Sequence, residues 1–497
     1  MGREEQIIEE RLRKLKELKT KGIDPYPHKF DRKHISSQLQ EKYAKLKSDA
    51  KTKDKVKLAG RIITKRDMGR ISFASLRDGY GNIQIIFQEG ETPKEAKDFF
   101  KKYIDAGDYI GVSGEIIKTK RGELSVLVKG LEILSKSIRP MPEKWHGLKD
   151  KEERYRKRYL DLIMNPEVKE VFLKREKILD AIREFLKKRG YLEVETPYLQ
   201  TIYGGAESRP FKTHLNALDM NLFLSISPEL YLKRLIIGGF DKIFTISRNF
   251  RNEGIDRWHN PEFTMMEIYE AYTDYNNMMD LFEELYEYVA KKINGSTKVK
   301  IHGHVIDFKR PWKRIKMVDA IKEYANIDVS KMSEEELKKI CNKEGLKVKE
   351  DSWGRYVCAI FEHFCEAKII QPTFITDHPC ESAPLCKGLR NDSICKFVER
   401  FEPFCLGTEL GNAYSELNDP LKQKELLEKQ EARLSKGDLE ANPYDRDFVT
   451  AMEYGMPPTG GVGVGIDRMV VLLTCQESIR DVLLFPFMKQ EKEDIIK

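Results

Sequence analysis

The sequence has no apolar run long enough to cross a membrane. We expect no targeting peptide, because the first 22 residues, MGREEQIIEERLRKLKELKTKG, mix acids with bases and contain neither an apolar core nor a small-residue cleavage site. A myristoylation signal would need Ser or Thr at position six, where this chain has Gln6. We therefore expect a cytoplasmic protein without a membrane partner.

Cysteine is absent from the first 340 residues, and all eight cysteines lie between Cys341 and Cys475. None of them forms a Cys-x-x-Cys pair, and no His-x-x-x-His accompanies them. This pattern disfavours a zinc site, since structural zinc is usually bound by such closely spaced pairs. Free thiols in a reducing compartment are the expectation for a chain of this length.

An excess of positive charge occurs at only one end of the chain. Residues 1–57 hold 17 Lys and Arg against 10 Asp and Glu, which accounts for the whole net charge of +7. The pattern predicts a basic helical arm over 1–55, whose first helix ends at Gly22 before Pro25 and Pro27. Such an arm suits a polyanion such as nucleic acid, although a solvated lysine-rich helix would show the same composition.

A small β-barrel is predicted after the arm. Five short β-rich runs, with a helix-like segment PKEAKDFFKKYID among them, lie between positions 56 and 135. This arrangement is typical of an OB-type barrel, which we expect over 56–140. Such barrels commonly bind single-stranded nucleic acid by stacking bases on aromatic side chains in a basic groove. Phe73 and Arg66 could serve that purpose, while a purely structural barrel remains the alternative.

A linker and a larger domain follow the barrel. Prolines and a dense run of charges mark a connector over 141–165, and the composition then changes. From about position 168 the pattern predicts a long amphipathic helix that ends at Gly190, followed by a strand that stops at Pro197. Mixed helices and strands continue to the end, which predicts an α+β domain over 166–497.

The stretch RNFRNEGIDRWHNPEFTMMEIYEAY, residues 248–272, combines an anion clamp with an acid in an apolar face. If it is a strand, a period of two places Phe263, Glu267 and Tyr269 on one face. Helical spacing fits the same letters equally well, so the pattern leaves both open. An acid in an apolar face needs a cationic partner, and Arg251 upstream suits a phosphate or carboxylate.

The glycine-rich run GGVGVGIDRM near the end could cradle phosphate or let a ligand approach the backbone closely. It is not a Walker A loop, because no Gly-Lys-Ser/Thr follows, and no βαβ unit with a downstream acid frames it as a dinucleotide fingerprint. Arg468, at the start of the hydrophobic segment that follows, is a second candidate for gripping phosphate or stacking on a base.

These separated pieces together resemble a known family. The helix, strand and proline at 173–197, the segment RNFRNEG…HNPEFTMMEIYEAY and the segment GIDRM are similar to motifs 1, 2 and 3 of class II aminoacyl-tRNA synthetases. With GGAESRPF, LGNAYSELNDP and RDVLLFPFMK, the resemblance extends to the lysyl-tRNA synthetases and covers residues 56–497. It implies an OB-type anticodon-binding barrel, then a class II antiparallel-sheet domain flanked by helices, and a homodimer through the motif 1 helix and strand.

The resemblance also implies roles for individual residues. Arg251 would hold the α-phosphate of ATP and the substrate carboxylate, and Phe263 and Arg468 would sandwich the adenine. Catalysis would rest on Arg251, Arg468 and Glu409, and Mg²⁺ would bind Glu402 and Glu409. The implied ATP site comprises Arg251, Asn252, Glu253, His259, Asn260, Phe263, Glu409, Leu410, Gly465, Ile466, Asp467 and Arg468.

The implied lysine pocket has two ends. Gly205 and Glu229 would hold the α-amino group, and Asn412 would help to hold the amino acid with Arg251. Two acids and a phenol would meet the side chain, namely Glu267, Glu416 and Tyr269. Anticodon contacts would come from Arg66, Phe73, Gln84 and Glu123. Two carboxylates and a phenol in a closed pocket suit a compact ammonium group and would reject neutral isosteres.

The implied activity is formation of lysyl-adenylate from L-lysine and ATP, followed by transfer of lysine to tRNA-Lys. Three alternatives remain at this stage. They are an aspartate- or asparagine-charging enzyme of similar architecture, a paralogue that lysylates protein but lacks the barrel, and a non-catalytic RNA-binding protein. Ala383 and Cys386 in HPCESAPLCKGL depart from the expected family pattern, which makes the local packing there hard to predict.

Overall fold

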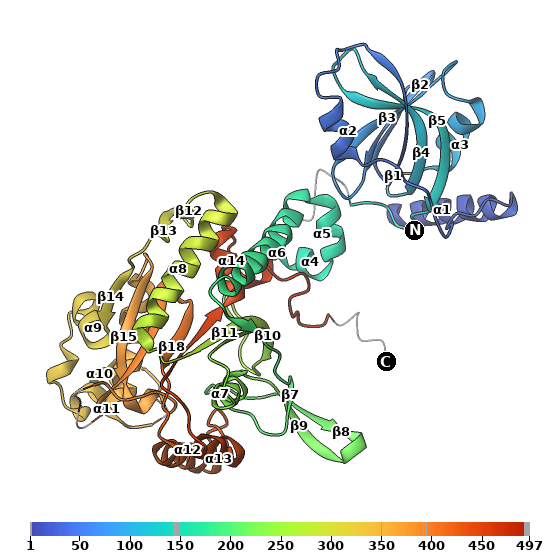
Figure 1. The fold of residues 1–497 in the computed structure, drawn as a ribbon. Coiled ribbons are helices and arrows are strands. Elements are labelled where there is room, and N and C mark those ends of the chain that lie inside the picture. The colour runs from blue at the N-terminus through green and yellow to red at the C-terminus, as the bar shows by residue number, and fades with distance from the viewer. Residues whose placement is uncertain (1, 143–149, 349, 391, 393–394, 492–497) are drawn as a thin grey trace. The chain divides into compact units, whose positions relative to one another are not determined.

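A computed structural model describes residues 2–142, 150–348, 350–390, 392 and 395–491 (Figure 1). The chain divides into two compact units, Met1–Gly147 and Leu148–Lys497, which we describe separately. No helix among the described residues is long and apolar enough to cross a membrane.

The first unit is a closed five-stranded barrel with three helices. Its strands follow the order β1-β2-β3-β5-β4, with β3 and β5 parallel and all other neighbours antiparallel. Helix α3 lies between β3 and β4 in sequence, as expected for an OB-type barrel. The elements are α1 (Arg3–Thr20), α2 (Ser36–Lys42), β1 (Lys51–Asp67), β2 (Ile71–Arg77), β3 (Asn82–Gln88), α3 (Lys94–Tyr103), β4 (Tyr109–Lys118) and β5 (Leu124–Ser135).

The barrel closes because apolar side chains alternate along each strand. On β2, for example, Ala74 and Leu76 are buried in the barrel core while Phe73 and Ser75 lie on the other face. All five predicted strands are present, and the predicted OB-type fold is confirmed. Strand β1 begins at Lys51, earlier than the pattern change at 56, so the last residues of the lysine-rich segment are strand instead of linker.

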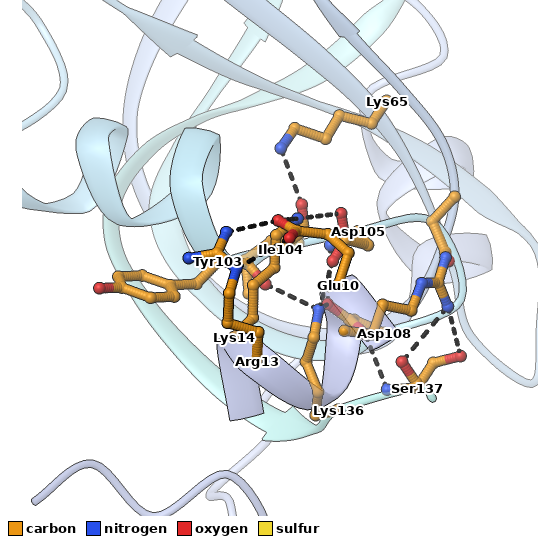
Figure 2. Close-up of polar contacts among 12 residues, drawn as sticks. Glu10, Arg13, Lys14, Lys65, Tyr103, Ile104, Asp105, Asp108, Lys136 and Ser137 are labelled. Carbon is orange, nitrogen blue, oxygen red and sulfur yellow. Dashed lines mark hydrogen bonds and ion pairs between the residues drawn. The ribbon is translucent and has the colours of Figure 1, made fainter. Parts of the chain in front are cut away.

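The N-terminal helix α1 docks onto the barrel. Leu18 is wholly buried in the barrel core, and Arg11 donates hydrogen bonds to the carbonyl oxygens of Arg139 (2.7 Å) and Ala106 (2.8 Å). Figure 2 shows the polar cluster beside it, in which Lys136 pairs with Asp105 and Asp108. The basic helix is therefore a fixed part of the first unit.

The second unit is built on one large sheet. Its strand order is β14-β15-β16-β18-β19-β11-β10-β6, with β17 paired to β16. The central pairings are antiparallel, as predicted, whereas the pairings at the two edges, β14 with β15 and β10 with β6, are parallel. The strands are β6 (Leu192–Glu193), β7 (Leu199–Gln200), β8 (Lys212–Leu215), β9 (Met220–Leu224), β10 (Lys242–Phe250), β11 (Glu262–Ala271), β12 (Lys298–Ile301), β13 (His304–Asp307), β14 (Lys313–Lys316), β15 (Thr373–Pro379), β16 (Phe397–Cys405), β17 (Thr408–Glu409), β18 (Gly411–Ser415) and β19 (Thr459–Gly465).

Helices cover both faces of this sheet (Figure 1). One face packs against α6, α8 and α14 in the largest hydrophobic core, and the other carries α7 against β10 and β11. The helices are α4 (Lys151–Arg156), α5 (Arg158–Met164), α6 (Pro166–Lys187), α7 (Glu229–Ile237), α8 (Tyr275–Asn294), α9 (Met317–Ala325), α10 (Glu334–Lys343), α11 (Trp353–Phe364), α12 (Pro420–Ser435), α13 (Arg446–Glu453) and α14 (Ile466–Leu473), with 3-10 turns at Asn216–Leu218, Val329–Lys331, Glu366–Lys368, Cys380–Ser382 and Ile479–Asp481.

The connector predicted over 141–165 lies partly outside the described residues, since 143–149 are not described. The remainder contains α4 and α5, which pack against the segment 480–483 of the same unit through Arg158. This arginine is almost wholly buried, pairs with Asp161, and donates to the carbonyl oxygens of Arg480 and Leu483. The predicted long helix is α6, but only Leu192–Glu193 of the strand expected after it pairs in the sheet.

Candidate active site

Strand β11 resolves the ambiguity of the stretch 248–272. It pairs with β10 on one side and β19 on the other, so Glu262–Ala271 is a central strand and not a helix. Met266 and Ile268 enter the large core, while Glu267 and Tyr269 line a cavity on the opposite face. The period of two therefore separates the core-facing from the cavity-facing residues.

This cavity has a volume of about 460 Å³, within the range of small-molecule sites. It brings together residues of the loop at 204–207, of β11, β16, β18 and β19, and of the start of α7. Of the predicted ATP, lysine and metal residues, those lining it are Gly205, Glu229, Arg251, Glu253, His259, Asn260, Phe263, Glu267, Tyr269, Glu402, Glu409, Leu410, Asn412, Glu416, Gly465, Asp467 and Arg468. Asn252 is exposed outside the lining, and Ile466 is buried in the large core.

The glycine-rich run forms strand β19, and every second residue of this strand from Gly461 onward lines the floor of the cavity. Each of these residues, together with the residues paired with it on the neighbouring strands, is called a level. Val462 and Val464 point into the core, so Gly461, Gly463 and Gly465 lie on the cavity face. Backbone pairing sets the neighbours at each level: Gly465 opposite Met265, Gly463 opposite Glu267 and Asn412, and Gly461 opposite Tyr269 and Tyr414. The run is thus a central strand with an open floor and not a phosphate loop.

Gly461 leaves room for an acid. A Cβ atom at this position would lie 1.9 Å from Oε1 of Glu416 and 2.7 Å from Cε1 of Tyr269. Any side chain would therefore displace the carboxylate or the phenol ring.

Glu267 accepts two hydrogen bonds inside the cavity. Ser227 Oγ donates to its Oε1 at 2.7 Å, and the Tyr269 hydroxyl donates to its Oε2 at 3.1 Å. Burial, together with the nearby negative charge of Glu229, raises the pKa of Glu267 to about 8. This carboxyl group lacks a cation strong enough to keep it ionised in the ligand-free pocket.

Glu229 and Glu416 share one buried lysine that the sequence pattern did not identify. Lys233 Nζ lies 2.6 Å from Oε1 of Glu229 and 2.5 Å from Oε2 of Glu416. Burial acts to lower the pKa of Lys233, but the two carboxylates outweigh it and raise this pKa above its ordinary value. Tyr414 also donates to Oε1 of Glu229, at 2.5 Å. The i, i+4 spacing of Glu229 and Lys233 on α7 was the only available signal.

Arg251 is one of the arginines that line the cavity. Its Nε donates to the carbonyl oxygen of Ile226 at 3.3 Å, and its guanidinium group lies 5.1 Å from the Phe263 ring centroid. Its terminal nitrogens make no hydrogen bond or ion pair with any described residue. Burial lowers the pKa of Arg251, yet an arginine stays protonated at neutral pH. The side chain is positioned to receive an anion.

Arg468 sits at the other end of the cavity. Its Nη1 donates to the carbonyl oxygen of Glu409 at 2.6 Å, and its Nη2 lies 3.1 Å from Nε2 of His259. The neighbouring Asp467 has a structural role. It accepts a hydrogen bond from the Thr264 backbone N–H at 2.8 Å and forms an ion pair with Arg175 at 2.6 Å. Asp467 therefore holds the start of α14 against β11 and α6.

Acids crowd the part of the cavity near Glu402 and Glu409. Burial, then the charges of Glu362, Glu402 and Glu409, raises the pKa of Glu366 to about 8. This surplus of negative charge suits a divalent cation, although the described residues contain no group of three or more His, Cys, Asp or Glu side chains arranged to hold a metal by themselves. Phosphate oxygens would have to complete such a site.

Arg400 is a second functional candidate that the sequence pattern missed. Its Nε donates to Oδ1 of Asn412 at 2.9 Å, and its Nη2 pairs with Oε1 of Glu402 at 2.5 Å. Arg400 thus joins a predicted lysine-binding residue to a predicted metal ligand. Its position two residues before Glu402 on β16, hence on the same strand face, was the available signal.

Comparison with known proteins identifies the family. A family model described as tRNA synthetases class II (D, K and N) matches residues 150–489, and one described as OB-fold nucleic acid binding domain matches residues 56–134. A lysine–tRNA ligase from Methanoculleus marisnigri is 51% identical over 481 residues, covering 96% of this chain and 94% of that protein. One from Syntrophomonas wolfei is 50% identical, covering 97% of each. The chain belongs to the class II lysyl-tRNA synthetases. The matching family model covers the classes labelled D, K and N, and the two relatives named above are lysine–tRNA ligases.

The presence of the barrel is explained by membership of the lysyl-tRNA synthetase family. The predicted anticodon residues on its strands share one face of the barrel. Arg66 pairs directly opposite Phe73, and Gln84 lies opposite Ser75, two residues along β2. Glu123 precedes Ser125, which pairs with Gln84 and donates to its Oε1 at 2.9 Å. Arg66, Phe73 and Gln84 therefore lie on the outer face of neighbouring strands, and Glu123 immediately precedes β5.

The two residues that depart from the family pattern are both buried in the cavity wall. Ala383 and Cys386 line it, and Cys386 forms an isolated β-bridge with Glu416. Burial raises the pKa of the Cys386 thiol, so it is a neutral neighbour of the acids. The segment thus packs beside Glu416, one of the predicted lysine-binding residues.

Proposed function

We propose that the chain activates L-lysine with ATP to form lysyl-adenylate and then transfers lysine to the 3′ end of tRNA-Lys. The observation that carries the proposal is the charge composition of the cavity. Glu229 and Glu416 share the buried cation Lys233, whereas Glu267 and the nearby guanidinium group of Arg251 form no ion pair with any described residue.

Free lysine balances these charges group by group. Once the bound substrate ionises Glu267, the three acids and Lys233 carry a net charge of −2, and lysine brings two ammonium groups. Its carboxylate then pairs with Arg251. Because an unpaired buried charge is very costly, a cavity of this composition favours a diammonium amino acid over a neutral or acidic one.

The levels of β19 suggest how lysine lies. We place the α-ammonium group at Gly463, beside Glu267 and near Gly205, whose backbone lies against Ser227. The side-chain ammonium then reaches the next level at Gly461, because two strand residues span about 6.7 Å and an extended lysine side chain about 6 Å.

In this orientation the side-chain ammonium group of lysine binds Glu416, Glu229 and Tyr269, and the α-ammonium group binds Glu267. The family resemblance implies the reverse for two of these acids, with Glu229 at the α-amino group and Glu267 at the side chain. Our assignment is supported by Lys233, which joins Glu229 to Glu416, whereas Glu267 is bonded to Ser227.

In the first step the lysine carboxylate attacks the α-phosphorus of ATP, an acyl–O–P bond forms, and pyrophosphate leaves. Arg251 holds the attacking carboxylate and the α-phosphate, while Phe263 and Arg468 hold the adenine. Mg²⁺ bound by Glu402 and Glu409 would neutralise phosphate charge. In the second step the tRNA 3′-hydroxyl attacks the carbonyl carbon and AMP leaves. Positioning and charge compensation account for the protein's part.

Three further parts of the proposal concern partners and location. The outer barrel face would bind the tRNA anticodon. A homodimer would form through α6 and the strand after it, where Leu173, Leu192 and Leu199 are exposed apolar side chains. The eight free thiols suit a reducing compartment such as the cytoplasm.

The decisive measurement is amino-acid-dependent ATP–pyrophosphate exchange. Lysine should support exchange, whereas aspartate and asparagine should not. Ornithine, one methylene shorter, should be used about 10- to 200-fold less well than lysine because its ammonium falls short of Glu416. Exchange with aspartate or asparagine alone would refute the proposal, and no exchange with any amino acid would favour a non-catalytic RNA-binding protein.

A further inference from the structure

We propose that Lys233 is a positioning residue that sets the charge of the lysine pocket, so that Glu229 and Glu416 together present one negative charge to the substrate. The inference rests on the proposed function and names a residue outside the cavity lining. Without a neighbouring cation, the two carboxylates would need two positive charges from the substrate. With Lys233 beside them, they need only one.

The ion pairs of Lys233 show that both acids depend on it. Nζ lies 2.6 Å from Glu229 and 2.5 Å from Glu416, and the side chain is fully buried. Helix α7 fixes the first pair, since Glu229 and Lys233 are one turn apart. The rings of Tyr414 and Phe448 lie 5.4 and 6.0 Å from Nζ and help to exclude water.

Lys233 does not occupy the substrate position. Glu229 and Glu416 line the cavity, whereas Lys233 is not among the lining residues and reaches the acids from behind. It therefore neutralises one charge without blocking the space that a substrate ammonium group would enter.

Glu416 keeps one oxygen for a ligand. Neither of its carboxylate oxygens has a hydrogen-bond partner among the described residues, and Oε2 lies 2.5 Å from Nζ of Lys233. Oε1 lies over Gly461, at the level where we place the side-chain ammonium group. A buried, unpartnered acceptor of this kind needs a donor from the substrate.

If Glu229, Glu416 and Lys233 together carry one negative charge, the effects of substituting these residues should combine in a predictable way. Glu416→Gln leaves Glu229 already neutralised by Lys233, so a substrate ammonium group meets no net negative charge. Adding Lys233→Met frees Glu229 to receive that ammonium group. Lys233→Met alone leaves two unpaired acids, one of which can take up a proton, so its effect should be smaller than that of Glu416→Gln.

The test is a double-mutant cycle on the full-length protein, measured by ATP–pyrophosphate exchange with lysine. E416Q should raise the KM for lysine by about 100-fold or more. K233M/E416Q should then have a lysine KM at least about tenfold below that of E416Q, with the KM for ATP within about twofold of wild type throughout. If Lys233 only stabilised the fold, the double variant should instead have a higher lysine KM than either single variant.

Arg234→Met is the matched control, because Arg234 is the next residue on α7 and pairs with Asp445 (2.8 Å) and Asp447 (3.0 Å) away from the cavity. It should leave the lysine KM unchanged. If K233M fails to fold, K233Q and K233Q/E416Q repeat the cycle with a neutral hydrogen-bonding side chain. No rescue in the double variant, or a lower lysine KM in K233M alone, overturns the inference. Absence of lysine-dependent exchange in the wild type would instead refute the proposed function.

Discussion

The absence of a side chain at Gly461 allows the acids of the pocket to meet. Oε1 of Glu416 occupies the space that a Cβ would fill, and the Tyr269 ring lies close beside it. The next cavity-facing glycine, Gly463, is less constrained, because its nearest neighbour is the flexible end of Met265 at 3.2 Å. The two positions therefore differ in what an added methyl group would displace.

Gly461→Ala should raise the lysine KM in the exchange assay by at least about tenfold and destabilise the protein by about 1–3 kcal/mol through overpacking. Gly463→Ala should have a smaller effect on both, because the Met265 side chain can move. The exposed Gly79, with no atom near its Cβ position, provides a folding control as Gly79→Ala. If G461A and G463A changed the lysine KM and the stability equally, the proposed difference between the two glycine positions would be wrong. Thermal unfolding and steady-state exchange measure the two quantities.

At the scale of elements, the loop that carries Gly205 is held by helices distant in sequence. Glu207 accepts hydrogen bonds from Arg355 of α11 at 2.8 and 3.1 Å, and from Arg433 of α12 at 2.9 Å. Burial acts to raise the pKa of Glu207, but the hydrogen bonds and charges of the two arginines outweigh it and lower this pKa to about 2. The folded state therefore favours the ionised form.

Glu207→Gln should lower the free energy of unfolding by about 2 kcal/mol at pH 7, since hydrogen bonds to a charged group are lost. The pKa in the fold, about 2, lies below the unfolded value near 4.3, so the contribution of Glu207 is complete above the unfolded value. It should disappear as the pH falls toward 2. Denaturation at pH 7, 5 and 3.5 should show a wild-type advantage that shrinks only at the lowest pH. The exposed Glu428→Gln on α12 is the control, and an advantage that grows toward acid pH would contradict the assignment.

At the scale of the whole molecule, the two units have separate cores, and we propose that they have separate tasks. The barrel core contains residues of the first unit only, and the cavity is lined entirely by the second. Phe73 belongs to a small apolar cluster on the outer barrel face with Ile86, Ile117 and Leu127. A substitution there should affect nucleic-acid binding without reaching the chemistry of adenylate formation.

Phe73→Ala should raise the KM for tRNA in aminoacylation by about tenfold, because stacking of a base on an aromatic ring contributes about 1–3 kcal/mol. Lysine-dependent exchange, which needs no tRNA, should keep its wild-type rate. Tyr109→Ala provides the comparison, since Tyr109 is an exposed aromatic paired with Arg61, away from Phe73 along β1. Parallel losses of exchange and aminoacylation in F73A would show that the units do not act separately.

Much of the fold could be predicted because local patterns and tertiary environment agree. The alternating runs between 56 and 135 predicted the strands of the barrel. In β19, Gly461, Gly463 and Gly465 fall on the cavity face because the valines between them require burial. The stretch 248–272 was ambiguous, because its letters satisfy both periods. Only pairing with β10 and β19 decided that it is a strand.

The sequence alone determined the family, the two-part architecture and many of the side chains that line the cavity, because those residues occur in closely spaced, recognisable motifs. Tertiary structure alone decided which of these side chains share a charge. In sequence, Glu229 and Lys233 look like an ordinary helical ion pair, and Glu416 lies far downstream. Their electrostatics depends on burial and on neighbours brought together by the sheet, and local spacing encodes neither.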